Sequence, residues 1–522
     1  MSDNRRDRKS SFQDGFVLPL KRMYLSDRFP LYIISIGVLI RLSQYLCNKS
    51  LWLDEAALSL NIINRSFSGL LGGLDYNQIA PIGFLFVQKA MTLLFGTSEY
   101  ALRLFPLVSG VLSLILFYHV AKSILKREAV PIALAFFALS WSLVYFSVEV
   151  KQYSSDVMLT LLFFLVFLCA QKRGFDVGGS ILLAALGCAA VWISHPVVFV
   201  MAGVGATCLF IAASKREWRR ALVLISICSL WALSFALHYF LFVSREGGSG
   251  KEWIYNYWSG HFAPFPVASM ADVEWYVEHL VMLFRSEFLL GMSPVAGVWL
   301  AVFLGGVVSL FIRERRVLFY LIIPFLVTLA ASALDLYPFY DRLIVFLLPL
   351  VILIVSEGLF EALARSRGRS PILSVLAALV IGISVIVPTV HSENSVFKPI
   401  TREEIKPVLA YISAHREPGD VIYIHYGAEY QYLYYADRYG LASMPAFSDT
   451  LIYENPYIFF FQLDEIEGNE RVWVLFSHIY NQDKIDKMRK NYLDHLDAAG
   501  VRLDSFYSAA AAVFLYDLGG GE

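Results

Sequence analysis

Residues 100–121 are YALRLFPLVSGVLSLILFYHVA, and this stretch indicates the class of fold. It is long and apolar enough to cross a bilayer, since a transmembrane helix needs about 20 mostly apolar residues. Ten further stretches have this character, at 31–47, 130–147, 156–171, 179–194, 196–213, 221–243, 291–312, 317–334, 343–360 and 371–389. The sequence therefore predicts a polytopic α-helical membrane protein with about eleven spans.

The composition of the chain agrees with this class. Hydrophobic residues make up 57% of its 522 residues and charged residues 17%, against roughly 45–50% and 25% in soluble proteins. The formal net charge is −1, and basic residues cluster only in short connections between the apolar stretches. These features favour membrane lipids as partners and give no support for nucleic acid.

The basic residues also predict an orientation, because cytoplasmic loops are enriched in Lys and Arg. They occupy alternate connections of an eleven-span chain: Arg5, Arg6, Arg8, Lys9, Lys21 and Arg22; Lys122, Lys126 and Arg127; Lys172 and Arg173; Lys215, Arg216, Arg219 and Arg220; Arg313, Arg315 and Arg316; Arg365, Arg367 and Arg369. We expect a cytoplasmic tail over 1–30 and a membrane domain over 31–390. Loops 48–99 and 244–290 and a domain over 391–522 then lie outside. Short loops and an outer domain without cysteine favour a bacterial inner membrane, with this domain in the periplasm.

The last 132 residues, 391–522, have the pattern of a small soluble α/β domain. Helical patterns cover 403–415, 429–439 and 482–498, and strand-like runs cover 421–426, 471–476 and 509–516. Alternating helices and strands favour one compact layered domain.

Two adjacent acids, Asp54 and Glu55, follow the first span in the stretch LWLDEA at 51–56. Carboxylates at this boundary can serve as a catalytic base, but Asp54 can equally cap a helix that begins at Glu55. Farther along the same loop stand Gln78 and a run from Ile82 to Phe95, which predicts a helix lying in the membrane interface.

A second acidic turn joins two apolar stretches and contains Glu149, Lys151, Tyr153 and Asp156. Charges this close to hydrocarbon are costly, so they tend to be paired or functional. The alternative to a functional role is an ion pair between Glu149 and Lys151 that fixes the turn.

Three arginines lie at or within predicted spans. Arg342, preceded by Tyr340 and Asp341, can bind a lipid phosphate through its planar fork, or it can extend to the interface as any such arginine can. Arg103 stands at the start of the second span. Arg41 falls inside the first span, where we expect Asp54, Glu55 or Asp156 as its partner, or a water-filled cleft.

The loop from 244 to 290 is rich in aromatic residues, which is typical of an interfacial belt, although one or two of them can serve to bind a sugar or an acceptor. His195, His261 and His279 are predicted to lie outside, but no spacing typical of metal ligands connects them. We predict no cofactor from the sequence and leave a divalent metal ion open.

In their order and topology these motifs resemble the GT-C superfamily of polyprenyl-phosphate-sugar-dependent glycosyltransferases. The closest resemblance is to the branch with protein O-mannosyltransferases and the bacterial aminoarabinose transferase that modifies lipid A. The residues that carry it are Trp52 to Ala56, Ala80-Pro81, Ala101 to Pro106 and Lys151 to Asp156. The chain departs from the family at Ala80-Pro81, where two prolines are common, and at Lys151-Gln152-Tyr153, where Arg-Tyr is common.

The resemblance implies inverting transfer of a monosaccharide from a polyprenyl-phosphate donor to a glycan, lipid or protein acceptor. Asp54 would be the general base, and Glu55 would position the acceptor or hold an adjacent helix. Lys151, Arg342 and Arg103 are the candidates for binding the donor phosphate. The residues expected to support the site are Glu149, Tyr153, Asp156, Arg41, Gln78, Tyr340 and Asp341.

Two other functions stay open at this point. The same scaffold can transfer a whole lipid-linked glycan en bloc or ligate a polymer. A flippase or transporter of lipid-linked sugars would favour paired repeats and helices broken at mid-membrane, and the sequence shows no such repeat.

Overall fold

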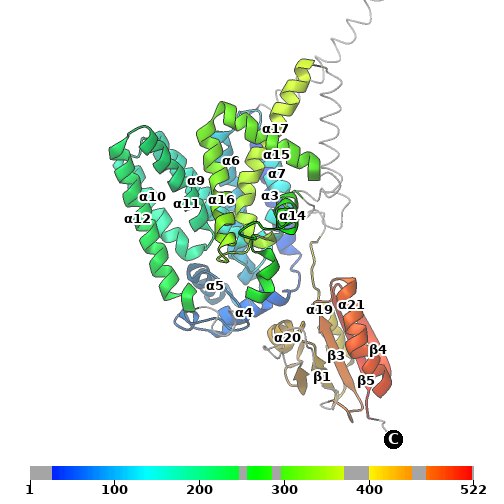
Figure 1. Ribbon diagram of the computed structural model, residues 1–522. Helices are drawn as coiled ribbons and strands as arrows, with labels where there is room; N and C mark the ends of the chain where they lie inside the picture. Colours follow the sequence, from blue (N-terminus) through cyan, green and yellow to red (C-terminus); the bar gives the residue numbers. More distant parts are fainter. Residues whose placement is uncertain are drawn as a thin grey trace, which may run out of the picture.

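The computed structural model describes Ser26 and residues 28–245, 255–284, 296–369, 399–448 and 466–519. A bundle of long helices forms one body, and a small sheet with its helices forms a second body at one end of it (Figure 1). The bundle helices are α3 (Phe29–Leu46), α6 (Glu99–Ile124), α7 (Val130–Leu139), α8 (Trp141–Tyr145), α9 (Tyr153–Lys172), α10 (Val177–Ile193), α11 (Val197–Ser214), α12 (Trp218–Leu241), α15 (Ala296–Arg313), α16 (Arg315–Ala333) and α17 (Leu348–Arg369), the last preceded by the 3-10 helix η7 (Asp341–Leu347).

These helices confirm an integral membrane protein. In the described residues, seven helical segments are long and apolar enough to cross a membrane, and the pair α7–α8, bent by 58°, would make an eighth. The spans predicted at 179–194 and 291–312 coincide with the shorter apolar helices α10 and α15. The span predicted at 371–389 lies outside the described residues, so the count of eleven stays a prediction.

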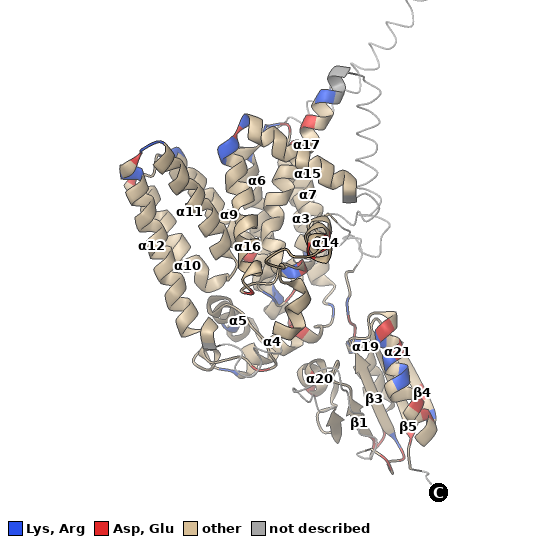
Figure 2. Ribbon diagram, in the orientation of Figure 1, with Lys and Arg blue, Asp and Glu red and all other residues tan. Residues whose placement is uncertain are grey.

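Charge is distributed unevenly along the bundle. Figure 2 shows Lys and Arg gathered at the end of the bundle away from the sheet, including the connection between α11 and α12 and the end of α17. The walls of the bundle between its two ends carry few charges (Figure 2). This is the segregation that the alternating basic connections predict.

The first outer loop forms two helices at the end of the bundle nearest the sheet. These are α4 (Leu53–Asn64) and α5 (Ile82–Phe95), and the second agrees with the predicted interfacial helix. The loop after α12 contributes α14 (Met270–Met282). α4 begins one residue after Trp52, so Asp54 and Glu55 both lie in its first turn, where acidic side chains favour the helix dipole.

The tail forms a five-stranded sheet in the order β2-β1-β3-β5-β4. Its strands are β1 (Val421–Ile424), β2 (Ala446–Ser448), β3 (Val472–Ser477), β4 (Val501–Ser508) and β5 (Ala511–Asp517). The first three pair in parallel, and β5 runs antiparallel to both β3 and β4. Every residue of β1 and β3 is buried, as is typical of central strands packed on both faces.

The helices of the tail are α19 (Lys406–His415), α20 (Glu429–Tyr435), α21 (Gln482–Met488) and α22 (Asp494–Ala499). The predicted α/β domain is thus present, with two differences. The predicted helix at 403–415 begins only at Lys406, because Glu403 and Glu404 bind the membrane domain instead. Strands β2 and β4 were not predicted, since β2 is only three residues long and β4 is an edge strand with mostly exposed or part-buried side chains.

Candidate functional site

Asp54 lies at the point where the helical bundle, the outer loops and the tail meet. Its Oδ2 forms an ion pair with Nη1 of Arg342 at 2.9 Å, and the two side chains stay 23% and 15% exposed. Asp54 comes from the first turn of α4, whereas Arg342 comes from η7, at the outer end of the helix that continues as α17. An acid and a cation far apart in the sequence therefore meet at one partly open place.

The neighbourhood of Asp54 is strongly cationic. Burial raises the pKa of its carboxyl, but the charges of Lys151 and Arg342, together with His478 and Arg402 from the tail, lower that pKa to about 2. Asp54 is therefore ionised at every pH near neutrality. For Lys151, burial is the main cause that lowers the pKa of its ammonium group, and nearby Arg342 adds to the effect.

Glu55 has a different environment from its neighbour, because its side chain has no exposed surface. Its Oε1 and Oε2 accept from Nε and Nη2 of Arg103 at 3.0 and 2.7 Å, and Oε1 also accepts from the backbone N–H of Val150 at 2.7 Å. Arg103 also donates to the carbonyls of Lys49 and Ser50, from Nη1 and Nη2. This pair ties α6 and the second acidic turn to the start of α4, and it faces no open space.

The capping interpretation of Asp54 is wrong. The N-cap of α4 is Trp52, and the carboxylate that reaches back to its backbone N–H is that of Glu55, at 3.4 Å. The first turn of α4 is thus held by Glu55, which leaves Asp54 without a capping role.

The ion pair between Glu149 and Lys151, which the sequence left open as an alternative, is not formed. Glu149 is fully buried, and its carboxylate accepts from the ammonium of Lys49 and from the indole N–H of Trp52. Lys151 instead donates to Oε1 of Gln78 at 2.7 Å, which joins the two outer segments predicted to support the site. Among the described residues Lys151 forms no direct ion pair, and its charge acts on the nearby carboxylate of Asp54.

Other predicted residues line the surroundings of this centre. Tyr153 and Asp156, in the first turn of α9, are both buried. Tyr340 stacks on His261 with ring centroids 3.7 Å apart, and Asp341 begins η7 directly before Arg342. The charges of Arg342, Asp54 and Asp341 act on Tyr153, so the start of α9 and the start of η7 lie close to each other.

Arg41 lies apart from this centre, and the prediction of an acidic partner for it is wrong. It is fully buried, and its Nη1 donates to the carbonyls of Gly37 and Ala138 at 3.0 and 3.1 Å. Ala138 lies in the last turn of α7, just before the bend to α8, where helix carbonyls lack partners and a positive charge is favourable. A small cavity beside Arg41 has room for about one water molecule. Arg41 therefore supports a broken helix.

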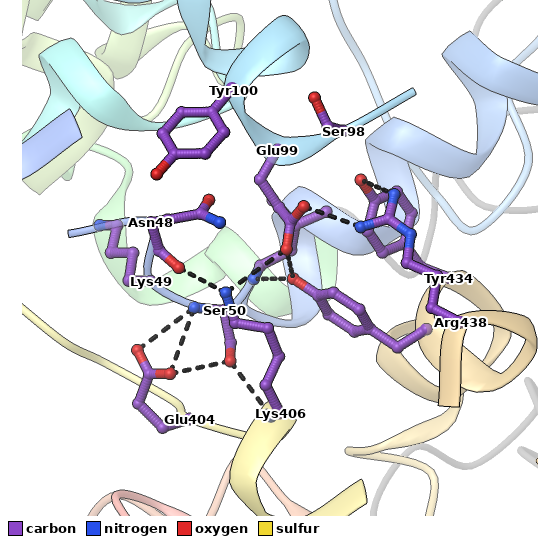
Figure 3. Close-up of polar contacts among 12 residues, drawn as sticks. Asn48, Lys49, Ser50, Ser98, Glu99, Tyr100, Glu404, Lys406, Tyr434 and Arg438 are labelled. Carbon is purple, nitrogen blue, oxygen red and sulfur yellow. Dashed lines mark hydrogen bonds and ion pairs between the residues drawn. The ribbon is translucent and has the colours of Figure 1, made fainter. Parts of the chain in front are cut away.

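The tail is held against the first outer loop by a polar cluster around Glu99 (Figure 3). The Glu99 carboxylate accepts from Nη1 of Arg438 at 2.8 Å and from the Tyr435 hydroxyl at 3.0 Å, and Lys406 lies 3.4 Å away. Glu99 is 4% exposed, so these charge-assisted bonds lie in a largely dry junction.

A second set of contacts reaches the segment just before Asp54. Glu404 accepts from the backbone N–H and the hydroxyl of Ser50, the latter at 2.9 Å (Figure 3). Glu403 accepts from the N–H of Leu53 at 3.1 Å and pairs with His478. Two consecutive tail residues thus fix the chain on the N-terminal side of Asp54.

The sequence did not predict these tail residues, nor Arg402 and Trp258, as parts of the site. Arg402 lies over the ring of Trp52 at 4.4 Å, and Arg342 lies 5.6 Å from the ring of Trp258. One signal was available: Arg402, Glu403 and Glu404 form a charged triplet at the start of an otherwise amphipathic helix pattern. Trp258 is one of many aromatic residues in its loop, and nothing in the sequence distinguishes it.

Among the described residues, no group of three or more His, Cys, Asp and Glu side chains is arranged to hold a metal ion. His261 and His279 instead stack on Tyr340 and Trp275, in each case with ring centroids 3.7 Å apart.

The helical bundle and its outer loops form the arrangement that the sequence motifs predict for a GT-C glycosyltransferase. Comparison with known proteins confirms this resemblance. Residues 80–243 match the family model described as dolichyl-phosphate-mannose-protein mannosyltransferase. No sequence among the curated proteins matches the chain.

The chain also resembles solved structures of membrane proteins. The crystal structure of ArnT from Cupriavidus metallidurans in the apo state is 12% identical to the chain, with a TM-score of 0.51 over 93% of this chain and 97% of that one. The same protein bound to undecaprenyl phosphate has a TM-score of 0.48 at 12% identity, over 94% and 98% of the two chains. The Archaeoglobus fulgidus oligosaccharyltransferase in its apo form has a TM-score of 0.49 at 12% identity, over 82% and 66%. The match to the apo structure of ArnT shows that the chain shares the fold of that protein.

Proposed function

We propose that the chain is an inverting glycosyltransferase that moves a monosaccharide from a polyprenyl-phosphate donor to an acceptor, with Asp54 as general base. The observation that carries this proposal is the contrast between two adjacent acids. Asp54 is 23% exposed beside Arg342, whereas Glu55 has no exposed surface and is held by Arg103. A general base must come within hydrogen-bond reach of the acceptor, and of these two acids only Asp54 has that access.

The class of donor is supported by the family match and by the charges of the site. The matched family is named for a dolichyl-phosphate sugar, in which a sugar is linked to a lipid phosphate. When the bond between the sugar and the phosphate breaks, negative charge develops on the phosphate, and fixed cations stabilise it. Lys151 and Arg342 lie beside Asp54 and serve this purpose, while Arg103 and Glu55 hold the framework.

The ion pair with Arg342 also suggests how Asp54 becomes active. With a pKa of about 2 the carboxylate is a weak base, because the surrounding cations stabilise its charge. A bound phosphate takes Arg342 and Lys151 as its own partners, which removes that stabilisation and raises the pKa of Asp54. Binding of the donor therefore prepares the base for the acceptor.

We further propose that the reaction takes place on the non-cytoplasmic face of a bacterial inner membrane. The site lies at the end of the bundle that carries the sheet, away from the end where Lys and Arg gather (Figure 2). The positive-inside rule assigns that basic end to the cytoplasm. A reporter fused to the C-terminus should therefore be active only outside the cytoplasm.

The activity is tested with the purified chain in lipid vesicles. It is supplied with single sugars on polyprenyl phosphate, sugars on polyprenyl pyrophosphate, and a cell-envelope extract as the source of acceptors. Release of free polyprenyl phosphate from the monophosphate donors is the expected result. Turnover of the pyrophosphate-linked glycans alone would refute the proposal in favour of en bloc transfer.

A further inference from the structure

The ring of Trp52 lies against two guanidinium groups, one from each part of the molecule. Cζ of Arg342 is 5.4 Å from the centre of the ring, and Cζ of Arg402 is 4.4 Å from it. Glu149 accepts the indole N–H and so fixes the orientation of the ring. Both distances are within the range of cation–π contacts, so the indole holds two like charges near each other.

The position of Arg402 is fixed on both sides. The N–H of Ile400 donates to Oε1 of Gln44 at 2.9 Å, which anchors the chain before Arg402 to α3. After it, Glu403 and Glu404 bind Leu53 and Ser50. The tail therefore presents Arg402 to the site in a defined place.

In the part of the chain that the structure describes, no carboxylate pairs directly with Arg402, although Glu149 and Glu403 lie near enough to stabilise its charge. Arg342, in contrast, pairs with Asp54. The next residue, Glu403, is occupied by His478 and by the N–H of Leu53. Partly buried cations that lack a carboxylate favour an anionic ligand.

We infer that Arg402 completes an oxyanion site with Arg342 and Lys151, and that this site binds the phosphate of the lipid-linked donor. The inference rests on the proposed function. In the transfer, the bond from C1 of the sugar to the phosphate oxygen breaks and its electron pair stays on the phosphate. A bond from the acceptor oxygen to C1 forms, and the acceptor proton goes to Asp54. The phosphate thus gains a negative charge, which a third cation stabilises.

The experiment measures binding of undecaprenyl phosphate to the full chain in detergent, together with its competition by inorganic phosphate. Arg402→Ala should weaken binding roughly ten- to hundredfold, the range expected for the loss of hydrogen bonds to a charged group. Arg402→Lys should recover part of the affinity, since the charge returns without the planar fork. A purely structural arginine would not change the competition by inorganic phosphate.

Two other tail arginines serve as controls. Arg502 pairs with Asp497 beside the edge strand β4, so Arg502→Ala should leave binding unchanged. Arg438→Ala removes a docking contact with Glu99 while keeping Arg402, and it measures how much a loosened tail alone contributes.

The outcomes separate the inference from the function on which it rests. If the wild type binds no polyprenyl phosphate, both are wrong. Thermal unfolding first shows that both Arg402 variants are folded. If they then bind polyprenyl phosphate as well as the wild type does, only the role of Arg402 is wrong. If Arg402→Ala slows transfer while binding of undecaprenyl phosphate is unchanged, the donor assignment is wrong and the anion belongs to the acceptor.

Discussion

Asp54→Asn is the change that separates catalysis from folding most sharply at this site. The amide keeps the size of the side chain and can still accept from Arg342, but it cannot take a proton from the acceptor. General base catalysis contributes about 10²- to 10⁴-fold to a rate, so the turnover should fall by that factor. Each tenfold loss corresponds to about 1.36 kcal/mol, which gives about 2.7–5.4 kcal/mol in the barrier.

The cost to stability should be much smaller. The pair between Asp54 and Arg342 is partly exposed, at 23% and 15%, and such pairs contribute about 0–1 kcal/mol. The unfolding temperature in detergent should therefore move by less than about 4 °C. Undecaprenyl phosphate should bind at least as well as to the wild type, because its phosphate no longer competes with a carboxylate for Arg342.

The assay follows release of polyprenyl phosphate from vesicles under single-turnover conditions, so that binding and chemistry are measured separately. Asp75→Asn is the matched control, since Asp75 lies in the same outer loop, pairs with Arg65 and is 57% exposed. A normal rate for Asp54→Asn would refute the assignment of the base. An equal loss of rate in both variants would show that the loop, and not one carboxylate, is being disturbed.

Three further predictions follow from the contacts of the site. Arg103→Met leaves the buried Glu55 without its partner and should destabilise the chain by about 3–5 kcal/mol, measured by thermal unfolding, whereas loss of donor binding at unchanged stability would contradict a framework role. Because burial lowers the pKa of Lys151, its charge should be lost at a lower pH than that of a free lysine, and the affinity for the donor should fall with it as the pH rises. Lys151→Arg should remove this alkaline loss of affinity. A pH profile of the variant identical to that of the wild type would show that Lys151 does not bind the phosphate. Glu99→Gln should make amide hydrogens of residues 429–439 exchange roughly ten- to hundredfold faster, since a charged acceptor in the docking junction is lost, and unchanged exchange would show that Glu99 does not hold the tail.

The fold was predictable from the sequence because hydrocarbon imposes a long apolar pattern on every helix that crosses it. Ten of the predicted spans coincide with helices, and the helix over Ile82–Phe95 was predicted with its bounds. The bend between α7 and α8 was not predicted. Beside this bend a cation from another helix, Arg41, donates to the carbonyl of Ala138, which lies 97 positions away in the chain.

The site was predictable only where the chemistry of a residue restricts its partners. Charged residues near hydrocarbon must be paired or functional, and this singled out Lys151, Glu149 and Arg342. It did not determine the pairs: Glu149 binds Lys49, which the sequence gave no reason to choose. The charged triplet Arg402 to Glu404 was the one signal for the contributions of the tail, and it does not distinguish a segment that faces water from one that binds another domain.

Asp54 and Glu55 are adjacent in the sequence but lie in opposite environments, because the start of α4 directs their side chains to different sides. Successive residues of an α-helix point about 100° apart, so two adjacent acids in a first turn cannot both face the same partner. Once Arg103 and the N–H of Val150 fix Glu55 inward, Asp54 must point toward a different side, and there it meets Arg342. Exchanging the two acids as a pair would therefore leave each in the wrong environment. An aspartate in place of Glu55 is one methylene too short for the bidentate contact with Arg103. A glutamate in place of Asp54 would move the carboxylate of the proposed base by one methylene. The two acids therefore have different roles: Glu55 holds the start of α4, and the start of α4 positions Asp54.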